Sequence, residues 1–329
     1  MNQLEREFDE AIKVYGGIYI PKENDSIEDL GLIHIKKNIL KFIKDIKLRT
    51  KSNTPDINVQ FVNNNTINAS AFKYNNNYHI GLFKGCILGL KDIVDQVFSY
   101  EEIRNMNIFG DYTIEEKKGF LYSCMIKFLV AHEYKHISNG HTDLISSLEM
   151  NELMEFQKIT DSEKAMYTQV LEFDADSCAI SAVINDMMIR VMPNIDLAKI
   201  YLVYIYLAIY LVFRMFGQGI DTMDNYNFES LEKTTHPNQG IRQTYTAATL
   251  STLLINAFGE KEASPIVANV INACFEIEKI INNDLEIKKI LIAIGTTDEA
   301  KKHLDKIINL WKKEVRNMLL PYAYDDLPE

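Results

Sequence analysis

The feature that most constrains this chain is the stretch 117–141, KKGFLYSCMIKFLVAHEYKHISNGH. Its apolar residues recur every three or four positions, which predicts an amphipathic α-helix. His132 and His136 continue the same stripe near the end of the helix, one turn apart on one face. Two imidazoles in this arrangement can bind a single metal ion. The sequence therefore predicts a helix that is buried along one side and carries a metal site near its end.

Glu133 directly follows the first histidine and completes the pattern HExxH. A glutamate at this position lies beside the metal, at a distance where it can hold a water molecule that the metal binds. Zinc peptidases activate the attacking water in this way. Because the motif is short, the structural alternative is two histidines of a buried helix beside a solvated glutamate.

A zinc peptidase needs a third protein ligand and leaves its fourth position open for water. The best candidate is Glu172, within a helical stretch at 162–191. Asp176 shares its face and is placed to hydrogen-bond a ligand histidine and fix its tautomer. Ala175 and Ala179 lie on the same face, so their small side chains would let this helix approach the HExxH helix closely. The alternative is a helix with ordinary surface acids.

Three further residues have roles that the sequence leaves open. His141 lies just past the expected helix end at Asn139-Gly140, so it is a third ligand, a substrate contact or a loop residue. Asp174 points about 200° around its helix from Glu172, which predicts a solvated or structural role. His236 and Arg242 bracket a helix start, where they can donate to the developing oxyanion of a tetrahedral intermediate.

Upstream of the HExxH helix, the sequence predicts two helices and then three short strands, at 4–14, 27–48, 57–62, 67–73 and 78–83. Asparagine-rich turns at 63–65 and 75–77 predict two hairpins and hence a small antiparallel sheet. In zinc peptidases an edge strand beside the cleft pairs with the substrate backbone. We expect this edge at Asn68, Ala69, Ser70 and Ala71; the alternative is a sheet that only supports the fold.

Composition limits the classes of function. Of the 329 residues, 47% are hydrophobic and 25% are charged, as in an ordinary globular protein with a large core. The net charge of −11 argues against nucleic acid or an anionic membrane as the main partner. Four cysteines without a CxxC pair predict neither a disulfide framework nor a cysteine zinc site. With an N-terminus unlike a secretory signal, these features predict a cytoplasmic protein.

The longest apolar run, at 200–213, contains no charged residue. It is shorter than the ~20 residues that span a bilayer, and it is rich in tyrosine. We therefore expect a buried central helix, with a membrane anchor as the alternative.

These motifs together resemble those of a known family. The chain resembles HExxH gluzincin zinc metallopeptidases of the CAAX-prenyl-protease superfamily, and within them the Lit-like phage-exclusion peptidases. Four blocks match in order: Asn68-Ala69-Ser70-Ala71, His132-Glu133-x-x-His136 with Asn139-Gly140-His141, Glu172-x-x-x-Asp176, and Thr235-His236-Pro237 with Arg242. They span roughly 57–242. The membrane segments of the prenyl-protease branch are not expected here, which argues against prenylated substrates.

The expected fold class is α+β, predominantly α, and the resemblance implies a helical zincin-like metalloprotease domain with a small antiparallel sheet before the HExxH helix. The expected organisation is N-terminal helices at 1–50, a metallopeptidase core at 51–245, and a C-terminal helical region at 246–329 packed on the core. By resemblance, one Zn²⁺ per chain is bound by His132, His136 and Glu172. Glu133 is then the general base, and His236 and Arg242 belong to the active-site wall. The family also implies an intracellular protein substrate, such as a part of the translation machinery, in a phage-defence setting.

The sequence thus supports the hypothesis of a soluble zinc endopeptidase, in which Glu133 takes a proton from the attacking water and passes it to the leaving amine. The alternative is a non-catalytic helical regulatory or partner-binding protein with a structural zinc site. A structural site is closed by four protein ligands. Convergence of His141 with the other three ligands would therefore favour the alternative.

Overall fold

The structure is a computed structural model that describes residues 1–329 except 24–25, 151–160, 192–193, 218–227, 283–290 and 329. In the first half of the chain the elements are α1 Gln3–Ala11, a 3-10 turn Lys13–Tyr15, β1 Ile18–Tyr19, α2 Ile27–Thr50, β2 Ile57–Val62, β3 Ala69–Tyr74, β4 Asn77–Phe83, α3 Lys84–Val97, α4 Glu101–Arg104, a 3-10 turn Asn107–Phe109 and α5 Ile114–Ser138. The second half contains α6 His141–Met150, α7 Asp161–Val191, α8 Ile195–Phe216, a 3-10 turn Phe228–Ser230, α9 Gln239–Phe258, α10 Glu260–Ile281, α11 Leu291–Gly295, α12 Asp298–Leu310, a π-helical turn Trp311–Val315 and α13 Arg316–Leu319. The expected α+β class with a helical majority is confirmed.

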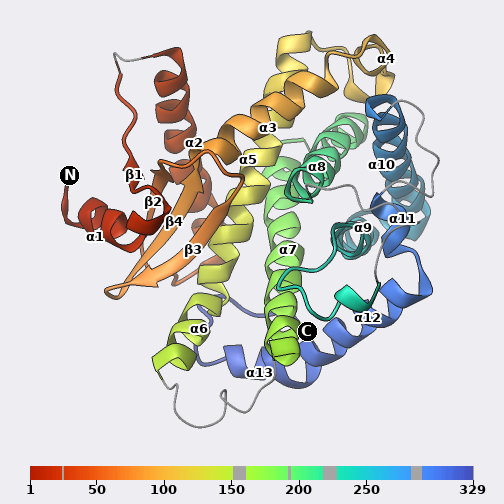
Figure 1. The fold of residues 1–329 in the computed structure, drawn as a ribbon. Helices are drawn as coiled ribbons and strands as arrows, with labels where there is room; N and C mark the ends of the chain where they lie inside the picture. Colours follow the sequence, from red (N-terminus) through yellow and green to blue (C-terminus); the bar gives the residue numbers. More distant parts are fainter. Residues whose placement is uncertain (24–25, 151–160, 192–193, 218–227, 283–290, 329) are drawn as a thin grey trace.

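Helix α5, which carries the HExxH motif, runs between the sheet and the helices of the second half of the chain (Figure 1). Thr113 caps its start through a capping box with Glu116. The helix ends at Ser138, and Gly140 follows with φ 83, a left-handed conformation that ends helices. The expected stop at Asn139-Gly140 is therefore confirmed, and the chain turns there directly into α6.

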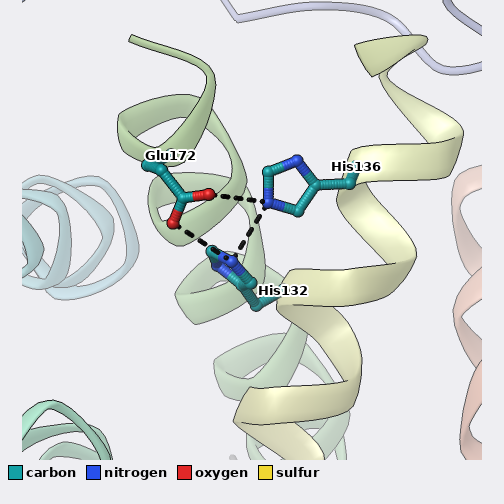
Figure 2. Close-up of side chains that lie close together, drawn as sticks. All are labelled: His132, His136 and Glu172. Atoms are coloured by element: carbon teal, nitrogen blue, oxygen red, sulfur yellow. Dashed lines mark hydrogen bonds and ion pairs between the residues drawn. The ribbon is translucent and has the colours of Figure 1, made fainter. Parts of the chain in front are cut away.

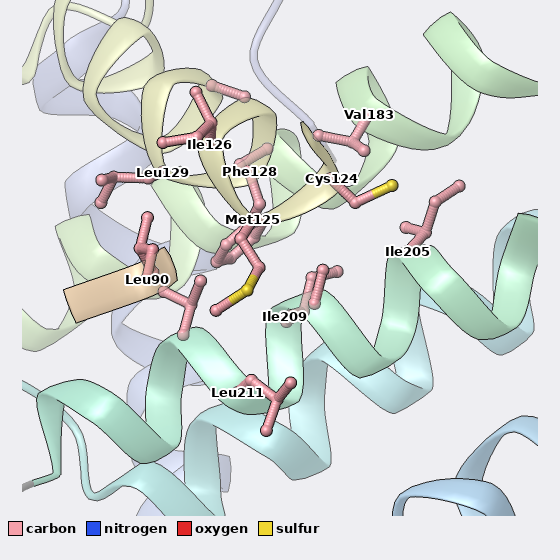
Figure 3. Packing of buried hydrophobic residues seen from close by; sticks show 14 of the residues in the cluster. Leu90, Cys124, Met125, Ile126, Phe128, Leu129, Val183, Ile205, Ile209 and Leu211 are labelled. Carbon is pink, nitrogen blue, oxygen red and sulfur yellow. The ribbon is translucent and has the colours of Figure 1, made fainter. Parts of the chain in front are cut away.

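The core forms where α5 packs against α3, α7 and α8 (Figure 3). Residues from several faces of α5 are buried, including Cys124, Met125, Phe128 and Val130. The helix is therefore enclosed on more sides than the expected amphipathic pattern implied. This enclosure leaves the side chains of α5 little room to move, because a protein interior is close-packed.

Helix α8 contains the longest apolar run. By length and composition it is apolar enough to cross a membrane, but 67% of its most apolar window is buried inside the protein. It contacts α5, α7, α9 and α10, and two of its tyrosines hydrogen-bond other elements: Tyr204 donates to the carbonyl of Phe109 at 3.0 Å and Tyr206 to that of Gln243 at 3.2 Å. These contacts are those of a central core helix.

The sheet differs from the expected antiparallel meander. Its strand order is β1-β2-β4-β3, and β2 pairs with β4 in parallel. The turn at Asn75 and Asn76 does form a hairpin between β3 and β4, with both residues at positive φ as a type I′ turn requires. The turn at 63–65 does not form one, so the prediction of an antiparallel sheet was wrong. Strand β4 is buried from Tyr78 to Phe83, as a central strand is, and it separates β2 from β3.

The chain after α13, residues 320–328, returns to the end of α5, and we call it the C-terminal tail. The backbone N–H groups of Tyr324 and Asp325 donate to the carbonyl of Ser138 at 2.8 and 3.2 Å. Lys135 on α5 donates to Asp325 at 2.7 Å, and both side chains are buried. The tail thus ties the end of the chain to the end of α5.

The boundary that was expected at position 245 lies inside helix α9, Gln239–Phe258.

Candidate metal centre

Three side chains from two helices converge at the C-terminal end of α5. Nε2 of His132 and Nε2 of His136 are 3.1 Å apart. Glu172 on α7 places Oε1 at 3.3 Å from Nε2 of His136 and Oε2 at 3.5 Å from Nε2 of His132 (Figure 2). Ala175 and Ala179 on α7 are fully buried, and α7 packs directly on α5.

The separations of these atoms match those around a tetrahedral metal ion. With metal–ligand bonds of ~2.0–2.1 Å, tetrahedral ligands lie ~3.3–3.4 Å apart. The two imidazole nitrogens are 3.1 Å apart, and they lie 3.3 and 3.5 Å from the two oxygens of Glu172, distances close to this value. Moreover, Oε2 of Glu172 is buried and has no hydrogen-bond partner, and its ion pair with Nη2 of Arg242 is 3.5 Å long, so a metal ion would satisfy this oxygen better. The group His132, His136 and Glu172 can therefore hold a metal ion.

The centre also carries an excess of buried negative charge. Glu133, Glu172, Asp174 and Asp176 are each at most 6% exposed, and the guanidinium of Arg242, equally buried, pairs with Asp176. Four carboxylates and one guanidinium leave three formal negative charges when the histidines are neutral. Uncompensated charge in a protein interior is expensive. A divalent cation would remove most of this excess.

Asp176 contacts His132, the first histidine of the motif. Its Oδ1 lies 2.8 Å from Nδ1 of His132, although the N–H direction is not aligned well enough for a regular hydrogen bond. Burial lowers the pKa of His132, but Asp176 and Glu172 outweigh burial and raise this pKa to about 9. Burial likewise raises the pKa of Glu172, yet His132 and His136 hold it well below its usual value. The carboxylates therefore favour positive charge at His132, which a metal ion supplies as well as a proton.

Arg242 contacts the centre differently from the expectation that it donates to an oxyanion. Its Nε and Nη2 donate to the two oxygens of Asp176 at 2.8 and 2.7 Å, and the hydroxyl of Tyr245 also donates to Asp176. Nη2 lies 3.5 Å from Oε2 of Glu172. Because these nitrogens face protein carboxylates, Arg242 orients Asp176 and through it His132. Tyr245 was not identified from the sequence.

Glu133 lies beside the three converging side chains and is not one of them. Burial raises the pKa of Glu133, and the neighbouring His132 and His136 together with the backbone N–H of Ala71 on β3 oppose this rise. A raised carboxyl pKa suits a group that takes up a proton and returns it. The structure thus brings the HExxH glutamate together with β3.

Two expected substrate contacts lie at the more exposed border of the centre. The side chain of His236 is 59% exposed, and its Nε2 is 3.7 Å from Oε1 of Glu172. Strand β3, which includes Ala69, Ser70 and Ala71, is at the edge of the sheet and contacts α5, and Asn68 immediately precedes it. Within the described residues, the outer edge of β3 has no partner strand.

The structure gives His141 a role outside the three that the sequence left open. Its Nδ1 is 3.0 Å from Nδ1 of His136, and its Nε2 is 3.0 Å from Oδ2 of Asp174. Both ring nitrogens are therefore engaged, and His141 lies behind His136, away from the converging ligands. Burial lowers the pKa of His141, which favours the neutral ring. Asp174 is 1% exposed, so of its two expected roles the structural one is confirmed.

Sequence reasoning missed Asn139 as well. Its side-chain amide donates to Oδ2 of Asp174 at 2.6 Å, and its residue is 1% exposed. The signal that could have found it is its place at the helix stop, where an asparagine side chain is free to bond outside its own helix.

Comparison with known proteins adds no relative. No protein-family model, no curated protein and no solved structure matches this chain.

Proposed function

We propose that this protein is a zinc-dependent endopeptidase that hydrolyses peptide bonds of a protein substrate. The observation that carries the proposal is the convergence of His132, His136 and Glu172 on one point, with Glu133 beside them. Two histidines and one glutamate are the protein ligands of catalytic zinc in one large class of peptidases. Zinc bound there would polarise the peptide carbonyl and activate a water molecule.

The other residues of the centre then have separate tasks. Glu133 takes the proton from the attacking water and delivers it to the leaving amine, a role that its raised pKa supports. His236, exposed and close to Glu172, donates a hydrogen bond to the developing oxyanion. The free edge of β3 pairs with an extended substrate backbone. The family resemblance extends the proposal to an intracellular protein substrate and a role in phage exclusion.

A second function is a non-catalytic partner-binding protein with a structural zinc site. The low exposure of the ligand side chains, 10% for His132, 15% for His136 and 8% for Glu172, favours it because access to the metal is narrow. A structural site, however, takes four protein ligands. Three converge among the described residues, and His141 already uses both of its ring nitrogens. The catalytic proposal is therefore the stronger one.

The test compares the two glutamates of the centre, which are equally buried at 6%. Zinc per chain would be measured by mass spectrometry for the wild type, Glu133→Gln and Glu172→Gln after each is offered zinc. We expect about one zinc in the wild type and in Glu133→Gln, and a marked loss in Glu172→Gln. A wild type that binds no zinc would overturn the proposal.

Activity is tested without knowledge of the substrate. A cell extract incubated with the wild type or with Glu133→Gln would be analysed by labelling of new protein N-termini. We expect new N-termini that appear with the wild type and not with Glu133→Gln. Identical N-termini from both proteins would refute the role of Glu133, and zinc binding without any new N-terminus would favour the structural-zinc alternative.

A further inference from the structure

The two candidate ligand histidines are supported from behind in different ways. Nδ1 of His132 faces a carboxylate, that of Asp176, at 2.8 Å. Nδ1 of His136 instead faces another imidazole, that of His141, at 3.0 Å. A carboxylate fixes the tautomer of a histidine by itself, because it can only accept a hydrogen bond. A neutral imidazole can donate or accept, so the support of His136 depends on what holds His141.

Asp174 holds His141 from the far side. Its Oδ2 lies 3.0 Å from Nε2 of His141 and accepts a second hydrogen bond from the side-chain amide of Asn139 at 2.6 Å. The hydroxyl of Ser138 donates to Oδ1 of Asn139 at 3.1 Å, which orients this amide with its nitrogen toward Asp174. All four residues are at most 1% exposed. Water therefore does not compete for these hydrogen bonds, which strengthens them.

The donors and acceptors available determine which ring nitrogens of His141 and His136 carry a hydrogen. Oδ2 of Asp174 already accepts a hydrogen bond from the amide of Asn139, so Nε2 of His141 is the group that donates to this oxygen and carries a hydrogen. A neutral imidazole has one N–H group, and Nδ1 of His141 is therefore an acceptor. Nδ1 of His136 must then donate to it. As a result, Nε2 of His136 has no hydrogen, and its lone pair is directed at the point where Glu172 and His132 converge.

We propose that Asp174 and His141 are positioning residues, which together hold His136 in the tautomer that binds metal. This inference rests on the proposed metal site and adds two residues to it. Through them, α7 supports both histidines: Asp176 acts directly on His132, and Asp174 acts through His141 on His136. Groups that support metal-binding histidines in this way typically contribute ~10–100-fold in metal affinity.

The first experiment measures zinc affinity by competition with a chromophoric chelator for the full chain and three variants. His141→Leu removes the acceptor for His136, and Asp174→Asn removes the obligatory acceptor for His141. His141→Asn keeps an acceptor oxygen close to the place of Nδ1. We expect His141→Leu and Asp174→Asn to bind zinc ~10–100-fold more weakly, and His141→Asn to restore most of the affinity.

A matched control separates this effect from general loss of stability. Asp186 is another buried acid on α7, 2% exposed, and its partners Lys127 and Arg49 are not part of the metal centre. Asp186→Asn should destabilise the fold and leave zinc affinity unchanged. If His141→Leu and Asp174→Asn affect zinc no more than Asp186→Asn does, the proposal is overturned.

The second experiment reads the tautomer directly, in metal-free wild-type protein, from the nitrogen chemical shifts of the histidine rings. We expect His136 to carry its hydrogen on Nδ1, and Asp174→Asn to shift it toward a mixture of tautomers. A hydrogen on Nε2 of His136 in the wild type would refute the inference. If the wild type binds no zinc but His136 has the expected tautomer, the proposed function fails while the positioning by Asp174 and His141 stands.

Discussion

Removal of Arg242 is the most demanding test of the charge balance at the metal centre. Arg242→Met keeps a long apolar side chain that can still pack on Phe213, whose ring centre lies 4.4 Å from the guanidinium carbon. The substitution removes two hydrogen bonds to Asp176, at 2.8 and 2.7 Å. Tyr245 and His132 would remain near Asp176, but the formal excess of buried negative charge would grow by one.

The expected cost follows from the burial of this pair. The side chains of Arg242 and Asp176 are 8% and 0% exposed, and loss of one partner of a buried ion pair costs ~3–5 kcal/mol. Because Tyr245 still donates to Asp176, we expect the lower value, about 3 kcal/mol. With a urea dependence of ~3 kcal/mol per molar for a chain of this size, the unfolding midpoint should fall by about 1 M.

The assay is urea unfolding of metal-free protein for Arg242→Met, Asp176→Leu and the double variant. The double variant removes both charges, so it should lose much less stability than the sum of the single variants. Saturating zinc should also reduce the loss in Arg242→Met, because the ion supplies part of the missing positive charge. A loss below ~1 kcal/mol in metal-free Arg242→Met, or strict additivity in the double variant, would refute this account of the charge balance.

Two further predictions concern the turn after α5 and the response to acid. Gly140→Ala places a side chain at φ 83 and 2.6 Å from the backbone of the C-terminal tail, whereas Gly259→Ala meets a similar φ of 82 in open space. Urea unfolding should show a loss of ~1–3 kcal/mol in the free energy of unfolding for Gly259→Ala, from backbone strain, and a clearly larger loss for Gly140→Ala. Equal losses would show that the C-terminal tail moves away from the new side chain at little cost. Burial alone raises the pKa of Asp186, but Lys127 and Arg49 outweigh it and hold this pKa below its usual value. Asp186 therefore stabilises the fold above about pH 4 and loses this effect as pH falls further, so Asp186→Asn should be less stable than wild type at pH 7, by a difference that shrinks as pH falls below about 4. A difference that persists unchanged at low pH would contradict the ion-pair explanation.

Periodicity predicted the long helices well. The stretches expected to be helical at 27–48 and 162–191 match α2, Ile27–Thr50, and α7, Asp161–Val191, to within two residues. The end of α5 was also predicted, because Asn-Gly is a local signal that needs no partner. Helix patterns of this kind depend on neighbours within one turn, so a single sequence contains most of the information.

Sheet topology was not predictable in the same way. Strand positions were found, but the pairing of β2 with β4 depends on which strand becomes central, and the turn at 63–65 has the same asparagine-rich composition as the true hairpin turn at 75–77. The two-residue strand β1 is too short to show alternation and was missed. One observation in the sequence did favour the true order: Ile80, Leu82 and Phe83 make the end of β4 apolar on both faces, which is typical of a covered strand.

At the candidate metal centre too, the sequence predicted positions within one helix and not the contacts between elements. Helical spacing placed Glu172 and Asp176 on one face, and the structure brings both to the two histidines. The same spacing turned Asp174 away from them, and yet Asp174 reaches His136 through His141. A helical projection gives the direction in which a side chain leaves its helix axis. It does not say which residues of other elements lie in that direction. Since the chain turns at Gly140 into α6, His141 comes to lie between His136 and Asp174. Two acids that point in different directions from α7, Asp176 and Asp174, can then support both imidazoles.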